Sequence, residues 1–200
     1  MKKFLLVSLT LVLLSFLLLG AKCELISWDA TNLLLTVKLT EEFIVQEDDP
    51  NYTEDNFINM IEMYEEQGVD NFDRIEDVTV QNIEIIFTEN NGPDVIEFTN
   101  AYANFRKDGE SIWYEIASLS DYSNTFTNIL NIPFDPFSSQ SETVLGTNPT
   151  NIGILEDHIS TIPPGNFWVQ ADMQGIGAAS LPADFKMELV LTLQLEIRSD

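Results

Sequence analysis

The stretch DFKMELVLTLQLEIRSD (residues 184–200) alternates apolar and polar side chains over most of its length. A period of two sustained over this length predicts a long strand with one buried face and one wet face, as in an antiparallel sheet. The apolar set comprises Phe185, Met187, Leu189, Leu191, Leu193, Leu195 and Ile197. This segment therefore indicates an all-β domain.

The same period recurs along the rest of the chain. Residues 32–46 (NLLLTVKLTEEFIVQ) keep one apolar phase that is broken only by Glu41. Asn91-Gly92 and Asp108-Gly109 supply the positive φ that tight hairpins need. Further strands are predicted over residues 78–89, 94–106, 111–119 and 166–177.

Two helical insertions interrupt the predicted strands. Thr53 is in position to cap a helix over residues 54–67, where Phe57, Met60, Ile61 and Tyr64 recur at helical spacing before Gly68. A shorter helix is predicted over residues 151–160.

These elements predict an antiparallel β-sandwich, with an immunoglobulin-like layout as one arrangement and a half-open barrel as the alternative. In either arrangement the long last strand is a candidate for an open edge. Residues 22–200 are enough for one domain with a real core and too few for two.

The first 21 residues have the pattern of an export signal. Lys2 and Lys3 precede an apolar run, and the small residues Gly20 and Ala21 follow it. We therefore expect a signal peptide over residues 1–21 and a mature protein in the periplasm, at the cell surface or outside the cell. An uncleaved anchor is the alternative.

Cys23 is the only cysteine, so no intramolecular disulfide can form. Its distance from the apolar run suits a lipoprotein signal, but Lys22 stands where lipoprotein processing prefers a small residue. Cys23 is thus either a lipidation site or an incidental residue beside an ordinary cleavage site, and the second interpretation is favoured. Apart from an uncleaved anchor, a lipid on Cys23 is the only expected contact with a membrane.

The chain is strongly acidic. Its formal net charge is −24, and loss of residues 1–21 would remove Lys2 and Lys3 and no acidic residue, giving about −26. Nucleic acids and anionic lipids are bound mainly through clusters of Lys and Arg. The densest basic spot is Arg106-Lys107, which is predicted to lie in a turn, so nucleic-acid binding is excluded as a function class.

The segment RIEDVTVQNIEIIFTENNGP (residues 74–93) and the closing strand FKMELVLTLQLEIR resemble a group of uncharacterised exported β-sandwich proteins of Bacteroidetes-like bacteria. The shared features are a short acidic stretch, an Ile/Val-rich strand, an Asn-Gly hairpin and a long amphipathic final strand. The resemblance implies fold and location. It also implies lipidation at Cys23, as in many members of the group.

Catalytic signatures are scarce. His158 is the only histidine, which excludes multi-histidine zinc sites, and no nucleophile-elbow sequence accompanies it. We expect it to be a surface residue of the second helix. Paired carboxylates of a small carbohydrate-active hydrolase remain the alternative function, since spacing in the sequence does not report such a pair.

Two acidic stretches are candidates for calcium, which takes six to eight oxygen ligands. The first contains Asp48 and Asp49, and the second contains Asp70, Asn71 and Asp73. Neither has the EF-hand arrangement. Solvated acidic loops are the favoured interpretation, and Ca²⁺ is the only cofactor that the sequence suggests.

Trp113 and Trp168 fall on the polar phase of their predicted strands. Together they would form a flat platform for a sugar or a protein. Alternatively a loop covers them, with Phe134 and Phe137 as the natural cover. The sequence as a whole therefore predicts a non-enzymatic exported protein, either a binding or adhesion module for an unknown protein or glycan, or a structural component of the envelope.

Overall fold

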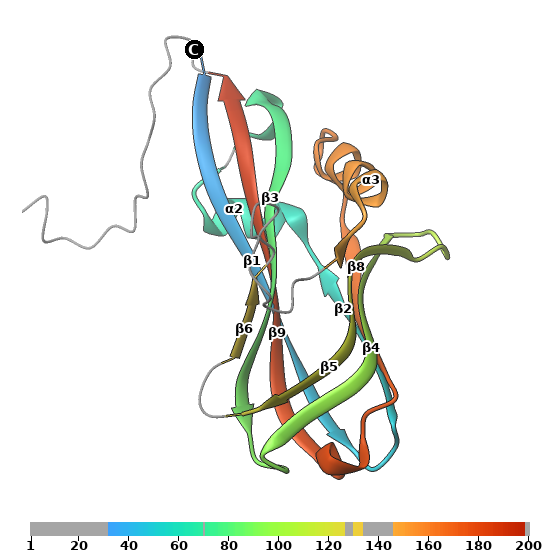
Figure 1. Ribbon diagram of the computed structural model, residues 1–200. Coiled ribbons are helices and arrows are strands. Elements are labelled where there is room, and N and C mark those ends of the chain that lie inside the picture. The colour runs from blue at the N-terminus through green and yellow to red at the C-terminus, as the bar shows by residue number, and fades with distance from the viewer. Residues whose placement is uncertain (1–31, 70, 127–129, 134–145, 199–200) are drawn as a thin grey trace, which may run out of the picture.

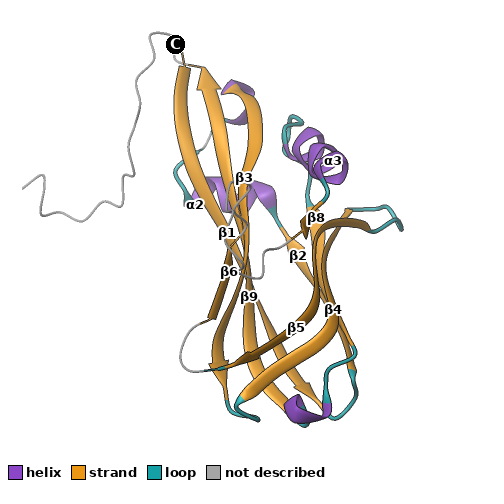
Figure 2. Ribbon diagram, viewed as in Figure 1, coloured by secondary structure: helices purple, strands orange, loops and turns teal. Residues whose placement is uncertain are grey.

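The computed structural model describes residues 32–69, 71–126, 130–133 and 146–198, which form an antiparallel β-sandwich (Figures 1 and 2). One sheet has the order β1-β9-β3-β6 and the other β2-β8-β4-β5-β7. The first comprises β1 (Asn32–Glu47), β9 (Ala183–Arg198), β3 (Ile75–Asn90) and β6 (Leu130–Pro133). The second comprises β2 (Asn51–Ile58), β8 (Phe167–Gln174), β4 (Val95–Lys107), β5 (Tyr114–Thr125) and β7 (Gly146–Thr147). The predicted sandwich is confirmed.

The strand pairs are nested along the chain. β1 pairs with β9, β2 with β8, β3 with β6 and β4 with β5, all antiparallel. A long hairpin folded over on itself in this way gives the jelly-roll order. The layout is therefore a jelly roll, and the immunoglobulin-like arrangement and the half-open barrel are both wrong for this chain.

Strand β9 lies in the middle of its sheet, between β1 and β3 (Figure 1). Its apolar phase faces the core, where Leu193 and Leu195 are fully buried. The expectation that this last strand forms an open edge is wrong, because the edge strands of its sheet are β1 and β6. The start of β1 and the end of β9 lie together, with Asn32 opposite Arg198.

The helix predicted after Thr53 is shorter than expected. Residues 51–58 form strand β2, and the helix α2 covers only Met60–Glu66, capped by Asn59. Tyr52 and Ile58 are buried, and β2 pairs with β8 along its whole length. The inter-strand hydrogen bonds thus override a local helical pattern that also fits residues 54–58.

The second predicted helix is confirmed as α3 (Pro149–Ile159). Glu156 Oε1 accepts a hydrogen bond from Val80 N of β3 (2.7 Å), and Asn151 Nδ2 donates to Glu115 O of β5 (2.8 Å). The helix therefore joins the two sheets at one end of the sandwich (Figure 1). Within the described ranges, neither α2 nor α3 is long and apolar enough to cross a membrane.

His158 of α3 is half-buried rather than a plain surface residue. Its Nε2 lies 2.7 Å from Asn166 O, just before β8. A side chain at Gly165 would collide with the imidazole ring, since a Cβ there would lie 2.3 Å from His158 Cε1. His158 thus helps to fix the connection from α3 to β8.

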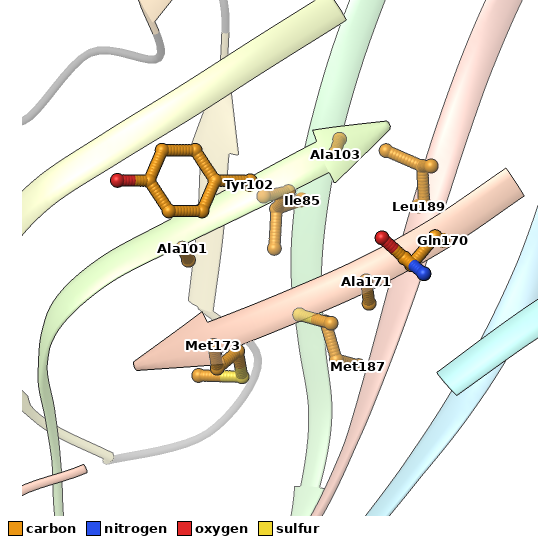
Figure 3. A pocket seen from close by; sticks show the side chains of 9 residues that line it. All are labelled: Ile85, Ala101, Tyr102, Ala103, Gln170, Ala171, Met173, Met187 and Leu189. Carbon is orange, nitrogen blue, oxygen red and sulfur yellow. The ribbon is translucent and has the colours of Figure 1, made fainter. Parts of the chain in front are cut away.

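The inner faces of the two sheets pack closely. Three small residues of the five-stranded sheet, Ala101, Ala103 and Ala171, lie opposite Met187 and Leu189 (Figure 3). The void between them is about 10 Å³ and is lined mainly by apolar atoms. A space of this size and polarity stays dry, so this part of the core is not a ligand cavity.

Glu41 lies within the inward-facing phase of β1, between the buried residues Leu39 and Phe43. Burial raises the pKa of its carboxyl above the ordinary value of 4.5. An inward-pointing charge on an edge strand is one of the devices that discourage pairing along that edge. The backbone of the next residue is also engaged, because Asn56 Nδ2 donates to Glu42 O (3.1 Å).

Substitution Glu41→Gln is expected to stabilise the protein at pH 7 by about 1 kcal/mol or less. The folded state holds the Glu41 proton more tightly than the unfolded chain, so the contribution of Glu41 to stability is greatest below pH 4.5 and is lost as the pH rises through the folded-state pKa. The gain from the substitution should therefore shrink on acidification. Urea unfolding at pH 7 and pH 4 tests this, with the exposed Glu110→Gln as control. A gain that is equal at both pH values would contradict it.

Tyr64 of α2 is fully buried, and its hydroxyl has no hydrogen-bond partner among the described residues. Burial also raises the pKa of this hydroxyl. Tyr52 provides a contrast within the same core, since it is 6% exposed and its hydroxyl donates to Glu54 Oε2.

Replacing Tyr64 with Phe should leave the free energy of unfolding unchanged or raise it by up to about 1 kcal/mol, because an unsatisfied buried hydroxyl is removed and the ring is kept. The matched substitution Tyr52→Phe should lower it by about 1 kcal/mol, because it breaks a made hydrogen bond. Denaturant unfolding of both variants measures the difference. Equal losses in the two variants would mean that the Tyr64 hydroxyl is satisfied.

Candidate binding face

The outer face of the five-stranded sheet carries a regular array of polar and aromatic side chains. Strands β2, β8 and β4 pair in continuous register, and every second residue of each points outward. These side chains form four rows across the strands: Phe57, Trp168 and Arg106; Asp55, Gln170 and Asn104; Thr53, Asp172 and Tyr102; and Asn51, Gln174 and Asn100. We call this array the outer polar face.

The first row continues to Trp113, and we call these four residues, Phe57, Trp168, Arg106 and Trp113, the aromatic ladder. The rings of Phe57 and Trp168 have centroids 5.2 Å apart and are tilted by 56°. The Arg106 guanidinium carbon lies 5.3 Å from the Trp168 ring centroid and 5.0 Å from that of Trp113. One cation is therefore shared by two indole rings, and each such contact is stabilising.

The register of the sheet positions this ladder. Phe57 is opposite Trp168, and Trp168 is opposite Arg106, so three strands place the side chains in line. Trp113 directly precedes β5 and comes to Arg106 through the hairpin turn, where Gly109 has φ +79°. These positions follow from strand pairing rather than from any local motif.

The hairpin turn fixes the ladder at two further points. Arg106 Nη1 donates to Glu110 O (2.7 Å), and Trp168 Nε1 donates to Asp108 Oδ1 (3.4 Å). The guanidinium is thereby oriented by the backbone of the turn while it lies over the two indole rings. A planar, delocalised cation suits this arrangement better than an ammonium would.

The structure brings together the two predicted site residues Trp113 and Trp168, both half-buried, with Arg106 between them. Trp168 contacts Phe57 and Arg106, so it belongs to a ladder rather than to an open, flat platform. The sequence interpretation missed Phe57 because it was assigned to a helix. The proposed cover by Phe134 and Phe137 falls outside the described residues.

Arg106 was also missed as a site residue, because it falls at the end of the strand predicted over residues 94–106 and Arg106-Lys107 was assigned to the turn that follows. Both residues belong to β4, which extends to Lys107. Alternation along NAYANFR is the signal that would have placed Arg106 on the outward phase with Tyr102 and Asn104.

The remaining rows are linked by hydrogen bonds between side chains. Asn104 Nδ2 donates to Gln170 Oε1 (3.1 Å) across β4 and β8. Asp172 accepts at both oxygens, from Thr53 Oγ1 (3.4 Å) and from Gln174 Nε2 (3.3 Å). These bonds orient the five side chains that take part in them.

The two predicted calcium stretches lie at opposite ends of β9. Asp48 and Asp49 follow Glu47, which is opposite Ala183, whereas Asn71 and Asp73 precede Ile75, which is opposite Ile197. Sixteen strand residues span roughly 50 Å, so the two stretches cannot share one ion.

Neither stretch forms a ligand cage in the part of the chain that the structure describes, where no group of three His, Cys, Asp or Glu side chains is placed to hold a metal. Asp49 Oδ1 accepts from the backbone and side-chain nitrogens of Asn51 (2.9 and 3.1 Å). Asp48 lines an open groove of about 330 Å³ together with Gln46 and Asp184. Asp70 lies outside the described residues, as does Cys23, and calcium binding stays a prediction.

No family model matches the chain, and no curated protein is significantly similar to it. The chain is similar to solved viral structures, with very low identity. Examples are Desmodium yellow mottle tymovirus (4% identity, TM-score 0.31, covering 90% of this chain and 98% of that one) and turnip yellow mosaic virus (7%, 0.32, 90% and 89%). Infectious bursal disease virus strain Gx gives 11%, a TM-score of 0.35, and coverage of 91% of this chain and 41% of that one. TM-scores in this range carry no information about function.

Substitution Arg106→Met is expected to lower the free energy of unfolding by about 1–2 kcal/mol, since it removes two cation–π contacts while keeping an apolar stem. It should also change the tryptophan emission spectrum of the folded protein. Lys107→Met, at the adjacent position, is the control and should change stability by less than about 0.5 kcal/mol. Urea unfolding followed by fluorescence measures both effects, and equal behaviour of the two variants would contradict the ladder.

Proposed function

We propose that this protein is an exported, non-enzymatic binding module that contacts its ligand through the outer polar face. The observation that carries the proposal is the continuity of the aromatic ladder with three rows of amide, hydroxyl and carboxyl side chains on one sheet face. Phe57 is 42% exposed and so offers apolar surface next to fixed polar groups. Apolar contact combined with a few oriented polar groups is the usual composition of a binding surface.

Export is the second part of the proposal and is supported by the charged start, apolar run and small residues of segment 1–21. The described chain begins in β1, which belongs to the four-stranded sheet. A tether before β1, whether an uncleaved signal or a lipid on Cys23, would join the sheet that does not carry the outer polar face. That face would then stay open to the medium.

The alternative of a carbohydrate-active hydrolase finds no matching site in the described residues. Such an enzyme needs an acid of raised pKa and a second carboxylate a few ångströms away in a cleft. Glu41 has a raised pKa, but it lines neither the core void nor the open groove near Asp48. Its raised pKa reflects its place on the inward phase of an edge strand.

The binding role is tested with two exposed apolar residues on opposite sheets. Phe57 (42% exposed) lies on the outer polar face, and Ile44 (46% exposed) lies on β1 of the other sheet. The purified protein is applied to immobilised cellulose, xylan, mannan, alginate, gelatin and polylysine. Phe57→Ala should weaken binding to the probe that retains the protein at least about tenfold, or 1.4 kcal/mol. Ile44→Ala should leave this binding unchanged.

Two outcomes would overturn the proposal. One is the absence of binding to every probe. The other is an equal effect of Phe57→Ala and Ile44→Ala, which would place the contact elsewhere or make it non-specific. Unfolding midpoints of both variants verify that a loss of binding is not a loss of fold.

A further inference from the structure

We infer that the ligand of the outer polar face is an uncharged polysaccharide chain lying flat across strands β2, β8 and β4. This inference rests on the proposed binding function and adds the chemical class of the ligand. Three features of the face carry it: the donors and acceptors of its amides, the sign and position of its charges, and its shape.

The amides supply the first argument. Asn104 and Gln170 share one hydrogen bond, from Asn104 Nδ2 to Gln170 Oε1, and neither amide makes another hydrogen bond within the described residues. Each amide can make several hydrogen bonds, so the Gln170 Nε2 donors and the Asn104 Oδ1 acceptor remain available side by side. A sugar hydroxyl both donates and accepts, and therefore suits neighbouring donors and acceptors of this kind.

A further amide, that of Asn100, lies on the same face of β4. Asn100 Oδ1 accepts from Ser120 Oγ (3.3 Å), which leaves its amide nitrogen free to donate to a ligand. Tyr102 lies on the outward phase between Asn100 and Asn104 and adds a ring and a hydroxyl. Hydroxyls, amides and aromatic rings thus recur along β4 without any apolar groove.

The charges argue against an anionic ligand. Asp55 and Asp172 lie on the face itself, and Glu115 is opposite Asn104 at the start of β5. The net charge of −24 adds a long-range repulsion for polyanions. Carboxylates accept hydrogen bonds from neutral hydroxyls, so they are compatible with an uncharged glycan.

The position of Arg106 argues against a cationic ligand. A basic side chain would be attracted to the faces of Trp113 and Trp168, but the Arg106 guanidinium already lies within 5.0–5.3 Å of both ring centroids. A second cation at these rings would meet like charge. The exposed ring of Phe57 remains available for the apolar face of a sugar ring.

The shape favours a chain over a small sugar. The rows from Trp168 to Gln174 extend over seven residues of β8, which is about 20 Å. The core void beneath the alanines, whose lining includes Tyr102 and Gln170 of this face, is only about 10 Å³ and cannot enclose a sugar (Figure 3). The open groove near Asp48 has none of the residues of this face in its lining. A flat sheet face of this length offers repeated contacts to an extended polymer and no enclosure for a chain end.

The test uses a matched pair of amides on the two sheets. Gln170 pairs with Asn104 on the outer polar face, and Gln194 accepts from Gln81 Nε2 (3.4 Å) on β9 and β3 of the other sheet. We measure binding by depletion from solution, for the unmodified protein and for the variants Gln170→Ala, Asn104→Ala and Gln194→Ala. The probes are neutral polysaccharides (cellulose, xylan, mannan), polyanions (alginate, polygalacturonate) and polylysine, each at 50 and 500 mM NaCl.

We expect at least one neutral polysaccharide to bind the protein. The affinity of the protein for it should change less than twofold between the two salt concentrations, since no ion pair is formed. Gln170→Ala and Asn104→Ala should each weaken this binding about five- to tenfold, and Gln194→Ala should leave it unchanged. Binding only to polylysine or to a polyanion, weakened by salt and by Phe57→Ala, would overturn the ligand class while the binding function stands. Absence of any binding that depends on Phe57, Gln170 or Asn104 would overturn both.

Discussion

The structure depends on the pairing of β9 along both of its edges. Its sixteen residues, Ala183–Arg198, are opposite β1 on one side and β3 on the other, so the last strand of the chain ties together the first and the third. Closing such distant pairs costs chain entropy, which is offset by a continuous apolar face of leucine, methionine and phenylalanine side chains. With β9 between β1 and β3, β1 is one edge of this sheet, and β2 lies in the other sheet.

The same nesting of strands creates the outer polar face. Because β2 pairs with β8 and β8 with β4, residues that are more than a hundred positions apart in the chain come into one row. Phe57, Trp168 and Arg106 lie in line only because three strands agree in register. A shift of β8 by one residue would turn Trp168 into the core and break the ladder. The ladder therefore forms only when the five-stranded sheet has its correct register.

The edge strand β1 shows how an acidic residue is accommodated among the inward-facing, otherwise apolar side chains of a strand. Glu41 interrupts an otherwise apolar phase, and its raised pKa records the cost of partial burial. A neutral residue at this position would pack better, but it would also leave a long apolar edge open to pairing with another chain. Nearby, Asn56 of β2 engages the backbone of Glu42 and bridges the two sheets on this side.

The sequence by itself determined the all-β, antiparallel class and the phase of the long strands, because a period of two in hydrophobicity follows directly from the geometry of a strand with one buried face. It also indicated the position of α3, whereas the choice of a two-sheet sandwich over a half-open barrel came from the structure. The sequence also placed Trp168 on the outward phase, whereas Trp113 was assigned to a strand that begins only at Tyr114. Only the tertiary structure decided the strand order, the central position of β9, the conversion of residues 54–58 from helix to strand, and the presence of Phe57 and Arg106 beside the tryptophans. The physical reason is that local periodicity specifies which face of a strand is buried, whereas partner and register are set by contacts between segments far apart in the chain, which no local pattern contains.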